Sequence, residues 1–136
     1  MTKFIMASHG KLSSGFKSSV DILLGSSDDL IIFDSYVDER DPKTEIEKMI
    51  ASTSEGETIV LLSDILGGSV NQIMMNHLVR PHTYLLTGVN LACLIELIVN
   101  KDNISKEFLK NTLQQSKEAM SIIELDVLED EEEEFF

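Results

Sequence analysis

Two residues that together could carry phosphoryl-transfer chemistry lie 55 positions apart in this chain. His9 follows the apolar run 4–7, and Asp64 follows the almost wholly apolar run 57–63. A neutral imidazole has one donor nitrogen and one acceptor nitrogen. A carboxylate that accepts from the ring N–H fixes the tautomer and leaves the other nitrogen's lone pair free. That nitrogen can attack phosphorus, and the carboxylate then stabilises the cation that forms.

A small-residue segment follows the aspartate. Gly67, Gly68 and Ser69 precede a segment with helical periodicity. Glycines allow a backbone to approach a ligand closely, and the first amides of a helix are free to bind an anion. Ser69 adds a hydroxyl donor. None of these features is specific alone, but a base, an orienting carboxylate and an anion cradle together predict a phosphoryl acceptor. Because Asp64 would hold one nitrogen of His9, we expect the other nitrogen to bond phosphorus.

Apolar runs alternate with amphipathic segments, which predicts the order β-α-β-α-β-α-β-α-α-β. The expected strands are 3–8, 30–37, 57–63, 82–87 and 122–128. The expected helices are 14–24, one that begins at Asp41-Pro42 and passes through Ile50, one that ends at about 77–80 after the Gly67-Gly68-Ser69 segment, 91–98, and 106 to about 120. Strands separated by helices favour a parallel sheet with right-handed crossovers, so the predicted fold is α/β and doubly wound.

The predicted strand order 2-1-3-4 brings the two chemical residues together. In such sheets, sites lie beyond the carboxyl ends of strands where the strand order reverses. The first and third strands flank that point, so His9 and Asp64 should meet there, with Gly88 and Asn90 on the rim. The last predicted strand, 122–128, alternates polar and apolar residues. It therefore suits an edge strand, antiparallel to its neighbour and exchanged with a partner subunit.

Composition narrows the function further. The 136 residues suit one domain, expected over 1–128, followed by an acidic tail over 129–136. The net charge of −13 argues against nucleic acid and anionic membrane surfaces as partners. The single cysteine, and the lack of a secretory or membrane-spanning pattern, predict a reducing cytoplasm. His9 and Asp64 supply only two metal ligands, so we expect no metal and no organic cofactor.

Three motifs resemble the enzyme IIA domain of the mannose-type (mannose/fructose/sorbose) sugar phosphotransferase system. They are Ser8-His9-Gly10, the segment SDILGGS over 63–69 and the segment TGVN over 87–90. The family commonly has Pro-Phe after GGS and an apolar residue followed by proline after GVN. This chain has Val70-Asn71 and Leu91-Ala92 there instead.

The resemblance implies a phosphotransferase activity and a set of partners. The first-strand histidine, here His9, would take a phosphoryl group from the phosphocarrier HPr and pass it to a IIB component. Asp64 would orient His9, and Ser69 would contact the phosphoryl group. The resemblance also implies a homodimer that exchanges its last strand. It further implies a cytoplasmic protein, attached peripherally to a membrane transporter and linked only indirectly to its IIC and IID components.

Four other functions share parts of this pattern. A response-regulator receiver needs an acidic pair after its first strand, where this chain has Ser8-His9. A flavodoxin-like module would hold FMN phosphate in the loop 8–15 and needs aromatic residues, but the chain has no tryptophan. A hydrolase with Ser69, His9 and Asp64 would lack the Gly-x-Ser-x-Gly elbow. A regulatory phosphoprotein, such as the IIA-like subunit of dihydroxyacetone kinases, would keep His9 and Asp64 and differ in its partner.

Overall fold

Four strands form one parallel sheet in the order β2-β1-β3-β4 in the computed structural model, which describes residues 1–125. They are β1 (Thr2–His9), β2 (Leu30–Ser35), β3 (Thr58–Ser63) and β4 (Thr83–Thr87). The predicted α/β class and strand order are confirmed. The register pairs Ala7 with Ser63 and His9 with Ser35. The first three strands therefore end at the same edge of the sheet.

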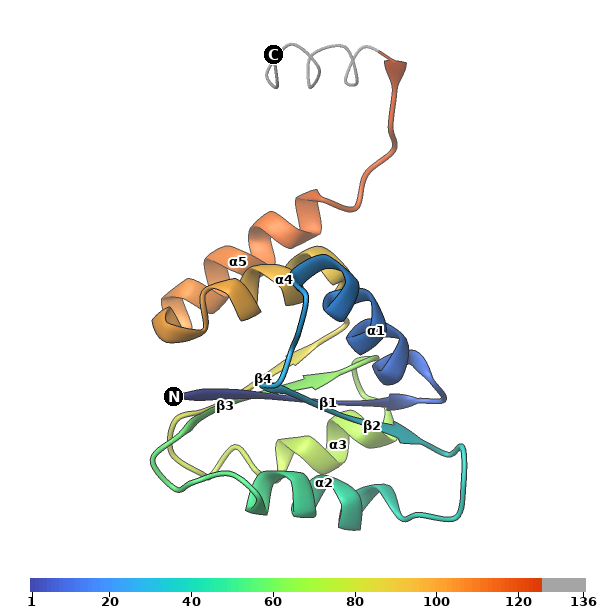
Figure 1. Ribbon diagram of the computed structural model, residues 1–136, viewed down its shortest axis with the longest axis vertical. Helices are drawn as coiled ribbons and strands as arrows, with labels where there is room; N and C mark the ends of the chain where they lie inside the picture. Colours follow the sequence, from blue (N-terminus) through green and yellow to red (C-terminus); the bar gives the residue numbers. More distant parts are fainter. Residues whose placement is uncertain (126–136) are drawn as a thin grey trace.

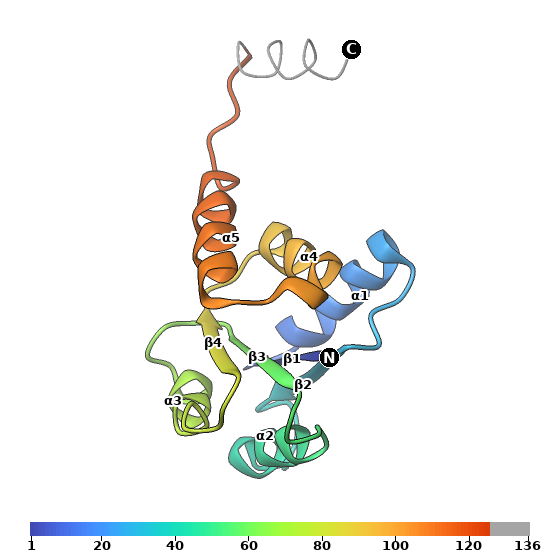
Figure 2. The same ribbon diagram turned by 90° about the vertical axis from the view of Figure 1, so that its left-hand side faces the viewer.

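Helices cover both faces of this sheet (Figure 1). α1 (Leu12–Leu24), α4 (Leu91–Val99) and α5 (Lys106–Glu118) lie on one face, while α2 (Pro42–Ala51) and α3 (Ser69–Met75) lie on the other. A short 3₁₀ helix, η1 (Lys101–Asn103), links α4 to α5. Figure 2 shows the same layers along the sheet, with α4 and α5 packed side by side.

Both faces of β1 are buried, and its side chains alternate between two cores. Phe4 and Met6 pack into the cluster beneath α1, α4 and α5, whereas Ile5 and Ala7 pack into the cluster formed with α2 and α3. This double burial explains why β1 and β3 are nearly continuous apolar runs in the sequence.

The helix starts follow local sequence signals. The side chain of Asp41 accepts a hydrogen bond from the amide of Thr44, and Pro42 occupies the first turn of α2. Ser105 caps α5 by accepting from the amide of Phe108. These caps satisfy amides that a helix cannot bond internally, which is why the sequence indicated both starts.

α3 and β2 end earlier than predicted, as does α5, which ends at Glu118. α3 ends at Met75, and the next amides, those of Asn76, His77 and Leu78, bond to carbonyls three residues back. Tight turns thus replace the last predicted helical turn. β2 ends at Ser35 because Tyr36 takes a left-handed backbone conformation, φ 67°, that a strand cannot accommodate.

The predicted last strand, 122–128, does not join the sheet of this chain within the described residues. Residues 121–124 follow α5 without regular secondary structure and extend away from the sheet (Figure 1). Residues 126–128 lie outside the described residues, and pairing with a second subunit stays a prediction.

Candidate functional site

His9 and Asp64 meet at the carboxyl edge of the sheet, as the sequence predicted. One oxygen of Asp64, Oδ2, accepts two hydrogen bonds from His9, at 2.8 Å from its backbone nitrogen and 2.9 Å from ring Nδ1. The His9 side chain is 44% exposed, and the Asp64 side chain is 10% exposed. A mostly buried carboxylate therefore fixes Nδ1 as the protonated nitrogen and leaves the lone pair on Nε2.

The environment of Asp64 keeps it ionised. Burial raises the pKa of the carboxyl, but the hydrogen bonds from the backbone N–H and the ring of His9 lower it by more. The net result is a pKa below the ordinary value. Asp64 therefore carries its negative charge at neutral pH and can balance a positive charge on His9.

Ser69 and Gly68 approach the other side of the His9 ring. The hydroxyl oxygen of Ser69, the first residue of α3, lies 3.4 Å from Nε2. A Cβ on Gly68 would lie 3.3 Å from Cε1 of His9 and 2.8 Å from Cγ2 of Ile65. Gly68 is therefore a position of close approach, where a side chain would disturb the ring. Gly67 has φ 78° and forms the turn that precedes it.

Tyr36 is a site residue that the sequence analysis missed. Its hydroxyl lies 2.6 Å from the hydroxyl of Ser69, and its ring centroid lies 5.3 Å from that of His9. The only signal in the sequence was its place directly after the second strand. A strand prediction that ran through Tyr36 to Val37 concealed that signal.

The first turn of α1 does not offer a phosphate cradle. The amide of Ser13 donates to Oγ of Ser8 at 2.8 Å, and the amide of Ser14 donates to Oδ1 of Asp34 at 2.9 Å. These side chains occupy amides that an FMN phosphate would need. The FMN alternative therefore loses its expected binding loop.

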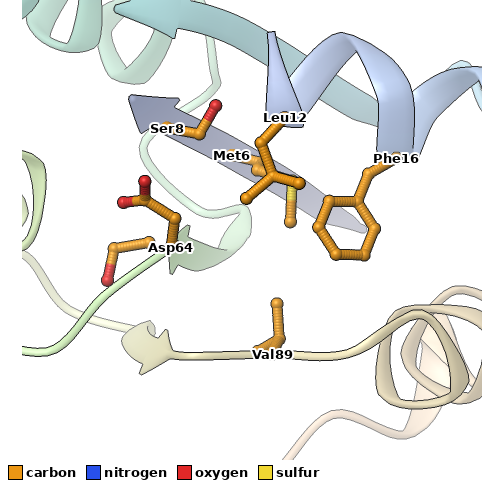
Figure 3. A pocket seen from close by; sticks show the side chains of 7 residues that line it. Met6, Ser8, Leu12, Phe16, Asp64 and Val89 are labelled. Atoms are coloured by element: carbon orange, nitrogen blue, oxygen red, sulfur yellow. The ribbon is translucent and has the colours of Figure 1, made fainter. Parts of the chain in front are cut away.

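A small hollow of about 80 Å³ lies beside Asp64 (Figure 3). Met6, Leu12, Phe16 and Val89 give it apolar walls. The second oxygen of Asp64, Oδ1, is buried and has no hydrogen-bond partner in the described part of the chain. All the hydrogen bonds that Asp64 accepts through its side chain there thus go through the oxygen that faces His9.

The side chain of the predicted rim residue Asn90 supports the fold. It accepts from the amide of Cys93 and donates to the carbonyl of Ser116, so it caps α4 and ties it to α5. Gly88 has φ 66°, and its amide donates to the carbonyl of Ser63.

Over residues 1–125, no group of three or more His, Cys, Asp or Glu side chains is placed to hold a metal ion.

Residues 3–114 match the family described as PTS system fructose IIA component. The match spans most of the chain and includes His9, Asp64 and Ser69. The chain belongs to this family. The predicted resemblance is thereby confirmed, and membership makes the chain a phosphotransferase-type protein of the PTS IIA class.

Solved structures share the fold of this chain. A phosphoenolpyruvate-dependent sugar phosphotransferase system permease from Klebsiella pneumoniae is 30% identical, with a TM-score of 0.85 and 93% of each chain covered. A mannose/sorbose-specific IIA subunit from Enterococcus faecalis is 20% identical, with a TM-score of 0.75, 91% of this chain and 96% of that chain covered.

A third structure has the same fold. It is the PTS IIA protein associated with the fucose utilization operon of Streptococcus pneumoniae, 19% identical, with a TM-score of 0.79 and coverage of 89% and 92%. No match to a curated protein sequence was found. In the described residues, no helix has both the length and the apolarity that crossing a membrane requires.

Proposed function

We propose that this chain is a phosphocarrier of a sugar phosphotransferase system. It accepts a phosphoryl group from phospho-HPr on Nε2 of His9 and passes it to a IIB component during sugar uptake. One observation carries the proposal: Asp64 holds Nδ1 of His9 at 2.9 Å, while the ring stays 44% exposed. The imidazole is thus oriented by a mostly buried carboxylate, while its side chain stays accessible to a docking protein.

The transfer step needs no proton movement at His9. The Nε2 lone pair forms a bond to phosphorus as the P–N bond of the donor phosphohistidine breaks. The bonding pair returns to the leaving nitrogen of the donor ring. The Nδ1 proton stays between His9 and Asp64, whose ionised carboxylate balances the positive charge that develops on the ring. Catalysis then rests on in-line positioning and on charge stabilisation.

In this proposal Ser69 donates to a phosphoryl oxygen, while Gly67 and Gly68 shape the loop around the phosphoryl group, because the amide of Gly68 already donates to the carbonyl of Ile65. Ser69 Oγ lies 3.4 Å from Nε2, close enough to donate to an oxygen of a phosphoryl group on that nitrogen. The absence of a side chain at Gly68 keeps the space beside Cε1 of His9 open. Gly67 contributes through the turn that sets this approach.

A hydrolase is the second candidate, because Asp64 contacts Nδ1 of His9 and Ser69 lies near Nε2, which is the spatial arrangement of a catalytic triad. Two contacts weigh against it. The distance of 3.4 Å between Ser69 Oγ and His9 Nε2 exceeds the usual range for an activated nucleophile, and Ser69 is also hydrogen-bonded to Tyr36.

The Ser69→Ala variant distinguishes a phosphocarrier from a hydrolase. A phosphocarrier should lose about 5- to 30-fold in transfer rate, since backbone donors remain, whereas a hydrolase should lose its nucleophile entirely.

Phosphoryl transfer tests the proposal directly. The full chain is incubated with phosphoenolpyruvate, enzyme I and HPr, and the label is mapped by mass spectrometry after alkaline handling. We expect an acid-labile, base-stable phosphate on His9 and its onward transfer to a IIB protein. His9→Ala should abolish labelling, while His77→Gln, a second histidine on the same chain, should label normally. Labelling that survives His9→Ala would refute the assignment. Labelling without onward transfer to any IIB protein would favour the regulatory phosphoprotein.

The family also motivates a proposal about assembly. β4 is an edge strand of the sheet, and Met120, Ile122, Ile123 and Leu125 expose 56% to 85% of their surface beyond α5. We propose a homodimer in which this segment is exchanged with a partner's sheet. Sedimentation equilibrium at micromolar concentration should give twice the chain mass of 15.2 kDa. A monomer at every concentration would contradict it. We further propose that this dimer works in the cytoplasm, beside the membrane components of its transporter.

A further inference from the structure

We infer that Tyr36 is a positioning residue for the phosphoryl group, acting through the hydroxyl of Ser69 and through the face of the His9 ring. This inference rests on the proposed function and adds a residue to its site. Tyr36 follows the end of β2, whereas Ser69 begins α3, so two segments that are distant in the sequence meet at His9.

The backbone at Tyr36 is held in an uncommon conformation. Tyr36 and His82 are the non-glycine residues with positive φ in the described part of the chain, and Tyr36 has φ 67°. For a bulky side chain this conformation is strained and persists only where surrounding contacts compensate. Tyr36 is 56% exposed, and its ring and hydroxyl contact the ring of His9 and the hydroxyl of Ser69. A strained turn thus places the Tyr36 ring beside His9 and its hydroxyl on Ser69.

The donors and acceptors at this point form a series. Nδ1–H of His9 donates to Asp64, so Nε2 can only accept. In the series that we infer, the hydroxyl of Ser69 directs its proton toward Nε2 across 3.4 Å, and its oxygen accepts from the hydroxyl of Tyr36 at 2.6 Å. When Nε2 becomes phosphorylated, the Ser69 proton faces a phosphoryl oxygen instead. The direction of the Tyr36 bond does not change between the two states.

This arrangement prepares the serine before phosphate arrives. A free serine hydroxyl rotates among staggered positions, so its proton must be ordered when the phosphoryl group binds. The hydrogen bond from Tyr36 holds that proton on the side of Nε2. A donor oriented in advance stabilises a developing charge without reorganisation at the moment of transfer. The tilted contact between the Tyr36 and His9 rings restrains the His9 ring, whose Nε2 is the acceptor for Ser69.

The test compares Tyr36→Phe, which keeps the ring and removes the hydroxyl, with Tyr84→Phe. Tyr84 lies on β4 in the core cluster beside α4 and α5, and is the only other tyrosine in the chain. The readout is the equilibrium constant for phosphoryl transfer between HPr and each variant. We expect Tyr36→Phe to shift this equilibrium about two- to tenfold toward phospho-HPr, the size of one hydrogen bond. Tyr84→Phe should leave it at the parent value.

A double-mutant cycle shows whether Tyr36 acts through Ser69. In a Ser69→Ala background, Tyr36→Phe should cause no further shift. An equal shift in both backgrounds would overturn the series, and no shift from Tyr36→Phe in the parent would overturn the whole inference.

A measurement without phosphate separates this inference from the proposed function. The ¹⁵N shift of His9 Nε2 should change in Tyr36→Phe and remain unchanged in Tyr84→Phe. An unchanged Nε2 shift in Tyr36→Phe would overturn the inference even if the parent protein is phosphorylated. Failure of the parent to accept phosphate, with the Nε2 shift still responding to Tyr36→Phe, would reject the phosphocarrier role and retain the hydrogen-bond series.

Discussion

At the residue scale, a single carboxylate oxygen decides which nitrogen of His9 keeps a free lone pair. Oδ2 of Asp64 accepts both the backbone N–H and the Nδ1–H of His9, so the ring cannot turn without losing a charge-assisted bond. Because the pKa of Asp64 is lowered, its ionised carboxylate holds the His9 ring fully at any pH above the usual pKa of a carboxyl group. It weakens only as the pH falls through the lowered value.

Asp64→Asn should disable transfer while the chain still folds. The amide either turns its NH₂ toward His9 and favours the wrong tautomer, or turns it toward the buried position of Oδ1, which has no partner. By analogy with the aspartate of hydrolytic triads, we expect the rate of transfer from phospho-HPr to fall by about 100- to 10,000-fold. Asp28→Asn changes an exposed carboxylate elsewhere and serves as the control. A parent-like rate in Asp64→Asn would remove this carboxylate from the mechanism.

At the element scale, the turn between β3 and α3 sets how closely the site can be approached. Gly67 supplies a left-handed turn, and Gly68 then passes against the His9 ring before α3 begins at Ser69. The buried bond from Ser63 to Asn71 fastens the end of β3 to the same helix. Val70 and Asn71, which replace the Pro-Phe common in the family, are both less than 4% exposed. These two differences from the family pattern therefore change the core.

Gly68→Ala tests the close approach. The new methyl group would meet Ile65 at 2.8 Å and His9 at 3.3 Å, so either the turn or the ring must shift. We expect the transfer rate to fall about 10- to 100-fold, the cost of a small misplacement of reacting groups. Gly15→Ala is the matched control, because nothing lies within 4 Å of its Cβ. It lies within α1, where the change should raise the free energy of unfolding by up to about 1 kcal/mol. Normal transfer in Gly68→Ala would show that the approach is not functional.

At the scale of the whole molecule, the end of the sheet opposite the site is fastened by charge. Asp29 bonds Lys3 of β1 at 2.9 Å and Lys101 of η1 at 2.7 Å. Hydrogen bonds from Lys101 and Lys3 lower the pKa of Asp29, and both lysine pKa values are raised in return. The network therefore joins the start of β1 to the connection between α4 and α5, at the opposite end of β1 from His9.

Asp29→Asn should lower stability without affecting transfer. Because the pairs are partly exposed, we expect the unfolding midpoint to fall by only about 2 to 4 °C. The folded pKa of Asp29 is lowered, so the contribution is complete above about pH 5 and is lost as the pH falls below about 4. Thermal unfolding of parent and variant between pH 3 and about 8 checks this. A difference that grows toward low pH would contradict the assignment.

The sequence by itself determined the order of strands and the meeting of His9 with Asp64. Periodicity located the strands, and parallel strands separated by helices carry their following residues to one edge. The glycines and Ser69 were readable because they directly follow Asp64 in the chain.

Only the tertiary structure decided which nitrogen of the His9 ring is free and which partners the Asn90 side chain bonds. It also showed that Tyr36 lies at the candidate site. The tautomer of His9 depends on which ring nitrogen faces the carboxylate. The positions of His9 and Asp64 in the sequence do not reveal how the ring is turned. Tyr36 reaches Ser69 through a left-handed turn at the end of β2. Hydrophobic periodicity contains no signal for such a turn, because contacts with residues distant in the sequence hold it in place.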